Sequence, residues 1–345
     1  MKTVKSLKDV KRRILIGTHS NIFHIGEVVA ISILCLAHEK DEIVIIRSKK
    51  YEELEKCDYV VNVGEGNGEN GRYGHYHKTI EKRKNGNLYG NAGFVWRDFG
   101  DKIIEEIFNK DILKNRRVIE KMFVNTETAK ELVNKQVKKM VDEDLIQNID
   151  LHQNGIKLAK DFNYVHSFLP KWYVEESYED LFDETLEITN KILKRYIIKK
   201  IDEVLASEEI NNRLTYGFYG NRFLKNNIVE IPKQHMPWLN IVIDYNNNIK
   251  EDKNVKDKKE KTVEFVMFPY HRGGWAAQAV PSSKKNIFEK IVPFPKEWSG
   301  ETVNLSKITG VNDAIYCHKS CFFVRAGSRE GVIKLCQLAK KLYSK

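Results

Sequence analysis

The chain has 345 residues, of which 41% are hydrophobic and 31% charged, and its formal net charge is +10. This length and composition predict two domains with sizeable cores, and they exclude a chain that is disordered throughout. No apolar run reaches the ~18 residues that a membrane span requires, and the basic N-terminus lacks the apolar segment of a secretory signal. The positive charge favours a polyanionic partner, although a lysine-rich proteome would also produce it.

The N-terminal region begins with a basic arm over residues 1–13. This arm is either a solvated tail or a segment that contacts phosphates. The basic residues considered as nucleic-acid contacts here are Lys5, Lys8, Lys11, Arg12 and Arg13.

Three short apolar runs follow and predict strands at 14–16, 43–46 and 59–63, with a helix at 27–38 between the first two. Strands that alternate with helices at this spacing predict a doubly wound parallel sheet, and therefore an α/β domain over 14–170. The Gly- and Asn-rich stretch after the third strand, 67–91, is predicted to be a loop.

Residues 99–145 and 174–210 are predicted to form two charged helical blocks. The second block ends in basic residues interleaved with apolar ones, and the favoured interpretation is a core helix with solvated lysines. The alternative is a nucleic-acid-binding helix. Its basic residues are Lys194, Arg195, Lys199 and Lys200.

The C-terminal region is predicted to be an α+β domain with a mixed sheet over 171–345, and the turn at Pro170 is the predicted boundary. Two strands are expected at 264–268 and 275–280, and a helix at 328–345. The charged run 250–261 is predicted to be a solvated loop.

Five scattered cysteines indicate reduced thiols in a cytoplasmic protein. Cys317 and Cys321 lie four residues apart around His318. No second pair completes a zinc site.

Four segments carry polar residues in a recognisable order, namely IGTHSNIFHIGE, VVNVG, RYGHYH and IDLHQNGI. With the later segments PWLNIVI and GGWAAQAVP, they make the chain resemble the melanocyte-proliferating-gene-one family over about 14–340. That family belongs to the Asp-His-His phosphoesterase superfamily. The resemblance implies the fold of that superfamily and metal-dependent hydrolysis, or 3′–5′ exonuclease activity, on RNA.

The resemblance also implies a set of metal ligands, and several of those positions differ here. Three aspartates of the family pattern are replaced by Gly26, Asn62 and Gln153, while the Asp and second His of the R-Y-D-H-H motif are Gly74 and Tyr76. Asn and Gln form hydrogen bonds but carry no charge, and glycine offers no side chain. Two divalent cations would therefore lack the carboxylates that offset their charge. We expect a pseudoenzyme without a cofactor.

Three histidines still match ligand positions of the family: His19, His24 and His75. Three imidazoles suffice to hold one zinc ion and leave a coordination position open. A single residual zinc or manganese ion is therefore an alternative to an empty, hydrogen-bonded remnant.

A second departure from the family lies near the C-terminus. Relatives carry the pattern G-F-I-G-G-x-x-T-R-E-G, whose glycines let backbone amides approach a phosphate. Here Val324 and Arg325 replace the glycine pair, and Arg329 is the arginine of the pattern. We interpret this stretch as a degenerate phosphate loop.

Three functions remain open. The first is a catalytically inactive relative that binds RNA or a ribonucleoprotein, with the ribosome favoured as the most abundant cytoplasmic polyanion and a stalling or dormancy role. The second is an active metal-dependent RNA phosphodiesterase that uses the histidines alone. The third is a scaffold for protein partners.

Overall fold

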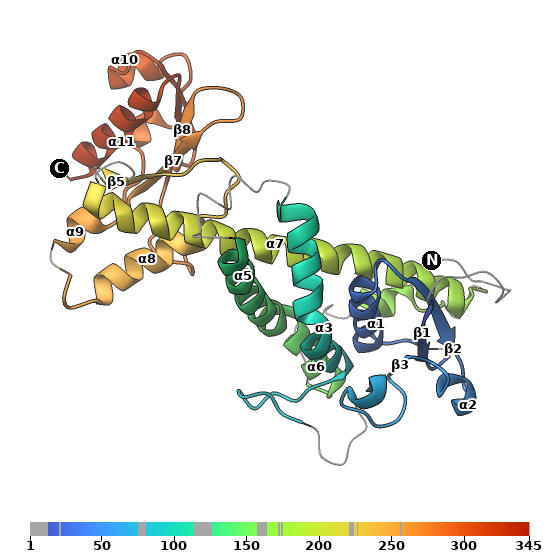
Figure 1. Ribbon diagram of the computed structural model, residues 1–345. Helices are drawn as coiled ribbons and strands as arrows, with labels where there is room; N and C mark the ends of the chain where they lie inside the picture. Colours follow the sequence, from blue (N-terminus) through green and yellow to red (C-terminus); the bar gives the residue numbers. More distant parts are fainter. Residues whose placement is uncertain are drawn as a thin grey trace. The chain divides into compact units, whose positions relative to one another are not determined.

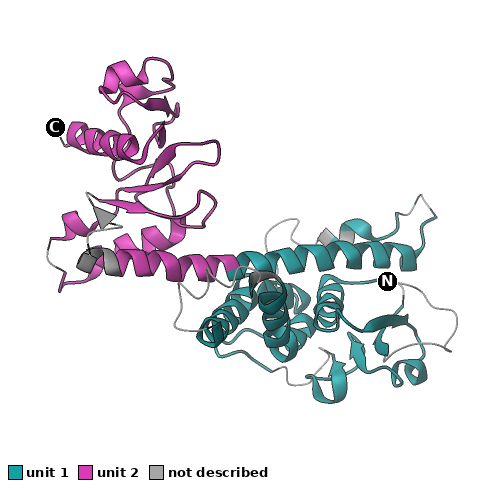
Figure 2. Ribbon diagram, turned by 45° about the horizontal axis from the view of Figure 1, so that its top comes forward, with its two compact units in different colours: residues 1–201 teal, residues 202–345 magenta. Residues whose placement is uncertain are grey.

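The computed structural model divides the chain into two compact units, Met1–Ile201 and Asp202–Lys345 (Figure 2). It describes residues 13–20, 22–74, 81–113, 126–156, 164–171, 173, 175–220, 224–225, 227–255 and 257–344. The division falls inside one long helix, α7 (Tyr178–Gly220), whereas the sequence analysis placed the boundary at Pro170. A continuous run of helix-forming residues carries no local signal of a change of unit.

Four parallel strands form the sheet of the first unit, in the order β2-β1-β3-β4 (Figure 1). Their bounds are β1 Arg13–Thr18, β2 Glu42–Arg47, β3 Tyr59–Val61 and β4 Arg72–Tyr73. Ile16 of the central strand is fully buried and pairs with Ile45 and Tyr59. The predicted parallel α/β sheet is confirmed. Strand β4 is an addition within the segment predicted as a loop.

Helices supply the rest of the first core, and α3 contacts α1, α5 and α6 (Figure 1). Their bounds are α1 Ile25–Ala37, α2 Tyr51–Leu54, α3 Asn91–Ile107, α5 Thr126–Val141 and α6 Gln147–Gln153. Helix α1 is buried almost all round, as its run of apolar residues requires. A π-helical turn, Asp142–Ile146, joins α5 to α6.

The second unit contains a six-stranded sheet in the order β5-β6-β7-β8-β10-β9. The β6–β7 pair is parallel and the other pairs are antiparallel, so the predicted mixed sheet is confirmed. The strands are β5 Leu224–Lys225, β6 Ile228–Glu230, β7 Phe265–Pro269, β8 Trp275–Ala279, β9 Ala314–Cys317 and β10 Phe323–Ala326.

Four helices of the second unit follow α7 in the described residues: α8 Leu239–Glu251, α9 Lys258–Lys261, α10 Leu305–Thr309 and α11 Arg329–Tyr343. The charged run predicted as a loop is therefore partly helical at both ends. Lys and Glu are good helix formers, and charge alone does not distinguish a loop from an exposed helix. Among the helices that the structure describes, none combines the length and apolar character needed to cross a bilayer.

The second sheet has two differently covered faces. On one, Val324 and Ala277 share a core with Leu335 of α11. On the other, Ala276 shares a core with Val242 of α8. Alternate residues of a strand point to opposite faces, so neighbours such as Val324 and Arg325 face opposite sides.

Candidate functional site

Polar side chains gather where two neighbouring strands of the first sheet end. Strand β1 ends at Thr18 and is followed by His19, and β3 ends at Val61 and is followed by Asn62. Asn62 has a φ of 60°, in the left-handed region that Asn and Asp tolerate better than other side chains. We call the residues Thr18, His19 and Asn62 the carboxyl edge, the place where open α/β sheets bind ligands.

A hydrogen-bonded network centred on Glu27 of α1 ties these groups together. The Thr18 hydroxyl donates to Glu27 Oε1 at 2.6 Å, and Asn62 Nδ2 donates to Glu27 Oε2 at 3.5 Å. Asn62 Nδ2 also lies 2.8 Å from His19 Nε2, and Asn62 Oδ1 accepts from Asn91 Nδ2 at 2.8 Å. Glu27 is fully buried. The predicted positions 19 and 62 are thus together, and Asn91 joins them from a helix that the sequence analysis did not connect to the site.

The two histidines of the first motif lie beside Glu27. His19 Nε2 is 3.1 Å from Glu27 Oε2, and the hydrogen bond to this carboxylate raises the pKa of His19 while burial opposes the rise. His24 lies just before α1, and its backbone N–H donates to Glu27 Oε2 at 3.4 Å. The two imidazole centroids are 6.1 Å apart.

Gly26 and Gln153 share one small space. A Cβ placed on Gly26 would lie 2.4 Å from Gln153 Oε1, so the carboxamide occupies the volume that a side chain at position 26 would need. The same oxygen accepts from the Asn91 backbone N–H at 3.3 Å. Asn91 also bonds Asn62, so positions 26, 62 and 153 lie near one another.

Gly74 meets a different requirement. A Cβ there would lie 2.0 Å from the carbonyl oxygen of Gly64, and the Gly74 N–H donates to the Gly66 carbonyl at 2.9 Å. Only glycine allows this approach of two backbones. His75 and Tyr76, the remaining predicted site residues of this motif, lie outside the described residues.

The side chains at the carboxyl edge determine whether this site fits metal ions. Positions 26, 62 and 153 contribute no carboxylate, and the carboxylate of Glu27 is already bonded to Thr18 and Asn62. Within the described part of the chain, which omits His75, no three His, Cys, Asp or Glu residues are grouped to hold a metal ion. Amides and imidazoles with one engaged carboxylate do not fit two divalent cations, whose hard charge needs several anionic oxygens.

A second polar cluster joins α6 to the segment that precedes α3. Asp150 of α6 is fully buried and accepts from Arg83 Nη2 at 2.7 Å and from the Gly93 N–H at 3.1 Å. Arg83 also bonds Asp142, at 2.8 Å from Nη2. Burial raises the pKa of Asp150 to about 6, and the charge of Arg83 opposes that rise. The sequence analysis missed this cluster because its members are far apart in the chain.

The family model described as Uncharacterised protein family (UPF0160), with the name MYG1 exonuclease, matches residues 15–339. The chain belongs to the MYG1 family. Its relatives include MYG1 protein C27H6.8 of Caenorhabditis elegans, 24% identical and covering 95% of both chains. MYG1 exonuclease of Mus musculus is 23% identical over 93% of this chain and 83% of its own, and MYG1 protein YER156C of Saccharomyces cerevisiae is 24% identical over 98% and 99%.

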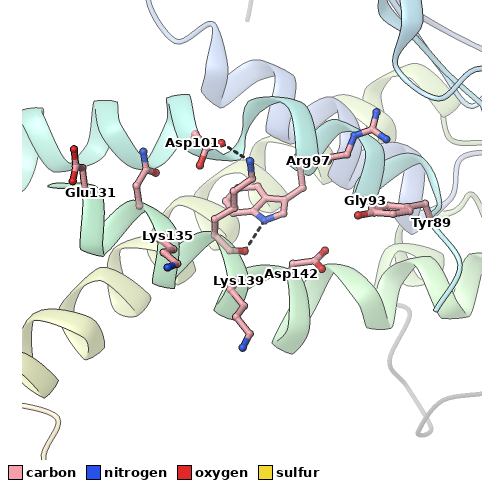
Figure 3. Close-up of a pocket in the computed structure, with 11 residues that line it drawn as sticks. Tyr89, Gly93, Arg97, Asp101, Glu131, Lys135, Lys139 and Asp142 are labelled. Carbon is pink, nitrogen blue, oxygen red and sulfur yellow. Dashed lines mark hydrogen bonds and ion pairs between the residues drawn. The ribbon is translucent and has the colours of Figure 1, made fainter. Parts of the chain in front are cut away.

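This MYG1-family chain also has a pocket of about 580 Å³ in its first unit, at α3 and α5 (Figure 3). Trp96 Nε1 donates to the Lys138 carbonyl at 3.1 Å, and the Lys138 ammonium pairs with Asp101. The lining is Tyr89, Gly93, Trp96, Arg97, Asp101, Glu131, Asn134, Lys135, Lys138, Lys139 and Asp142. Its charges are mixed, and it contains none of the residues that the sequence analysis proposed.

The basic residues proposed as nucleic-acid contacts have varied surroundings. Lys194 Nζ lies 2.5 Å from Glu39 Oε1, and Lys200 is buried with its Nζ 2.7 Å from Asp144 Oδ2. Arg195 and Lys199 are exposed. Arg13 is the first residue of β1 and pairs with Glu42, and the proposed contacts outside the described residues are Lys5, Lys8, Lys11 and Arg12. Two of the four proposed α7 residues, Lys194 and Lys200, thus form ion pairs within the first unit.

The positions interpreted as a phosphate loop have regular secondary structure instead. Val324 and Arg325 lie in β10, and Val324 is fully buried in the sheet core. Arg329 begins α11 and its Nη2 lies 2.6 Å from Glu230 Oε2. An alternating pattern of four residues is too short to identify this strand from sequence. Val324 and Arg325 therefore belong to a strand of the sheet core and not to a loop.

Proposed function

We propose that this MYG1-family chain does not hydrolyse RNA with a two-metal centre and instead binds RNA or a ribonucleoprotein. The observation that carries this proposal is the position of Gln153, whose carboxamide fills the space in front of Gly26. Asn62, the third carboxylate position of the family pattern, is engaged by Asn91. Asn62 and Gln153 are neutral and both accept from Asn91, so they supply none of the anionic charge that a pair of metal ions needs.

The RNA part of the proposal rests on charge and kinship. The net charge is +10, and several relatives carry the name MYG1 exonuclease. A relative that loses hydrolysis but keeps a polyanion-binding surface becomes a binding protein. The ribosome is the partner we favour, in the cytoplasm and in a stalling or dormancy role.

The alternative is an exonuclease that uses one metal ion on His19, His24 and His75. The proximity of the His19 and His24 rings favours this second candidate. A single zinc ion on three imidazoles would supply a hydroxide for hydrolysis.

One experiment separates the two candidates. A 5′-labelled single-stranded RNA is incubated with the protein in EDTA and then with Mn²⁺, Mg²⁺ or Zn²⁺, and both binding and product length are followed. We expect binding without shortening under all four conditions. Shortening that needs metal and disappears in the His24→Ala variant would overturn the proposal in favour of the exonuclease. An absence of binding would overturn the RNA part.

A gain-of-metal variant tests the structural argument directly. Gly26→Asp, Asn62→Asp and Gln153→Asp together restore the three aspartates, and the shorter residue at 153 makes room at 26. We expect the triple variant to retain Mn²⁺ through dialysis while the unsubstituted chain does not, as measured by elemental analysis. Equal retention by both would contradict the view that these three positions decide metal binding.

A further inference from the structure

Aromatic residues gather on one face of the second sheet, at its β10–β9 end. Arg325 of β10 lies directly opposite Tyr316 of β9 and Ala276 of β8, and Phe323 lies two residues earlier in the same strand. These side chains therefore point to the same face. Phe323, Tyr316 and Arg325 are half-buried, whereas Val324 between them is fully buried on the opposite face.

The rings of this face form a connected series. Phe323 lies 6.0 Å from Tyr270 and 6.3 Å from Tyr316, measured between ring centroids. The series continues from Tyr316 to His318, at 6.4 Å, and from Tyr270 to His271, at 4.5 Å. We call Tyr270, Tyr316, Phe323 and Arg325 the aromatic face.

Unlike Arg329, Arg325 has no ion-pair partner among the residues that the structure describes. Its guanidinium carbon lies 3.9 Å from the centroid of the Tyr270 ring, and Nη2 donates to the Gly273 carbonyl at 3.5 Å. Among the described residues no carboxylate pairs with it, and its Nε is buried without a hydrogen-bond partner. Arg329, four residues later, is paired with Glu230.

These features are typical of surfaces that bind single-stranded nucleic acid. Aromatic rings and guanidinium planes stack on bases, and an uncompensated cation contacts phosphate. Two exposed cations lie in the turns that flank the strands, Arg272 between β7 and β8 and Lys319 between β9 and β10. A partner that is negatively charged and carries planar groups would bind both kinds of residue.

We propose that the aromatic face binds single-stranded RNA, with bases stacked on Tyr316 and Phe323 and a phosphate on Arg325. This inference rests on the proposed function, because it assigns a surface to the RNA binding proposed there. It requires neither the carboxyl edge nor the basic residues of α7.

The test is fluorescence anisotropy of the full-length protein with a 12-nucleotide uridine RNA. We expect Tyr316→Ala and Arg325→Ala each to weaken binding by roughly tenfold. Tyr316→Phe keeps the ring and is expected to bind within about twofold of the unsubstituted protein. Arg325→Ala is also expected to lower the slope of log affinity against log salt by about 0.7.

The charge control is Lys334→Ala, which removes one positive charge at an exposed position of α11, the helix that packs on the opposite side of the sheet. It is expected to change affinity by less than about twofold, since surface cations distant from the RNA add little beyond a Debye length. Equal weakening by Lys334→Ala and Arg325→Ala would overturn the inference, because general charge would then explain binding.

A second measurement uses no variant and therefore still tests the inference if a substituted protein fails to fold. The unsubstituted protein is cross-linked to 4-thiouridine RNA, and the modified residues are mapped by mass spectrometry. We expect the cross-links on the aromatic face. Binding with cross-links elsewhere would overturn this inference alone, whereas absence of RNA binding by the unsubstituted protein would overturn the proposed function as well. If the aromatic face instead binds a protein in the absence of RNA, the inference that this face binds RNA would also be overturned.

Discussion

The carboxyl edge of the first sheet and the aromatic face of the second differ in how their polar groups are satisfied. At the carboxyl edge, Asn62 contacts Glu27, Asn91 and His19 at once, so the hydrogen-bonding groups are largely used by one another. On the aromatic face, Arg325 lies on the Tyr270 ring, and in the described part of the chain no carboxylate pairs with it. A network whose polar groups mostly bond one another stabilises the fold, whereas a cation without a counter-ion is available to a ligand. The comparison therefore predicts large stability effects in the first region and small ones in the second.

The largest effect on stability is expected at Asp150 of α6. Asp150→Ala removes a buried carboxylate and leaves Arg83 with one carboxylate partner instead of two, so the free energy of unfolding should fall by about 3–5 kcal/mol. Urea denaturation measures it. The matched control is Asp142→Ala, whose carboxylate is 23% exposed, and its loss should be clearly smaller. Equal losses would show that burial of the pair does not decide its contribution.

A smaller effect is expected where Gly26 meets Gln153. Gly26→Val overfills this space and should lower the free energy of unfolding by about 1–3 kcal/mol. Adding Gln153→Ala clears the volume, so the double variant should recover at least ~1 kcal/mol relative to the sum of the single changes. Additive losses in this double-mutant cycle would mean that the two positions do not compete for the same space.

The hydrogen bond between His19 and Glu27 should give a pH-dependent contribution. The bond raises the pKa of His19 above its usual 6.5, so the folded state holds the proton more tightly than the unfolded state. The resulting stability is complete below about pH 6.5 and is lost as pH rises through the folded pKa. In EDTA, the difference in unfolding free energy between the unsubstituted protein and His19→Gln should shrink between pH 6 and 8. A difference that grows with pH would contradict this assignment.

The smallest stability effect is expected on the aromatic face. Arg325→Ala loses a cation–π contact and a long hydrogen bond, and the free energy of unfolding should fall by less than about 1 kcal/mol. Arg329→Ala, which breaks the contact with Glu230, is the comparison variant in the same denaturation series. A loss from Arg325→Ala as large as that from Asp150→Ala would remove the contrast between the two regions.

The sequence predicted the elements whose signals are local. Alternating short apolar runs and helical patterns identified β1, α1, β2 and β3, and the direction of the sheet followed from the connections. The strand pair at β7 and β8 was equally clear, because a turn rich in glycine separates two apolar runs. Each of these predictions needed only neighbouring residues.

What the sequence left open depends on distant partners. Arg83 and Asp150 are 67 residues apart, and no local pattern connects them. Strand β10 was interpreted as a loop from the glycine pattern of the resembled family, and its pairing with β8 and β9 becomes visible only in the fold. The candidate positions 26, 62 and 153 came from a family resemblance. The resemblance could not show that Gln153 fills the volume in front of Gly26.

The volume shared by Gly26 and Gln153 also constrains how the residues at the carboxyl edge can change in evolution. Asn62 already has a backbone conformation that an aspartate tolerates, so exchange between the two residues is possible at any time. Positions 26 and 153 are not independent in this way. A side chain at 26 requires either a shorter residue at 153 or a shift of the Gln153 carboxamide out of this space. Substitutions at 26 and 153 should therefore be coupled, whereas those at 62 should occur independently of them.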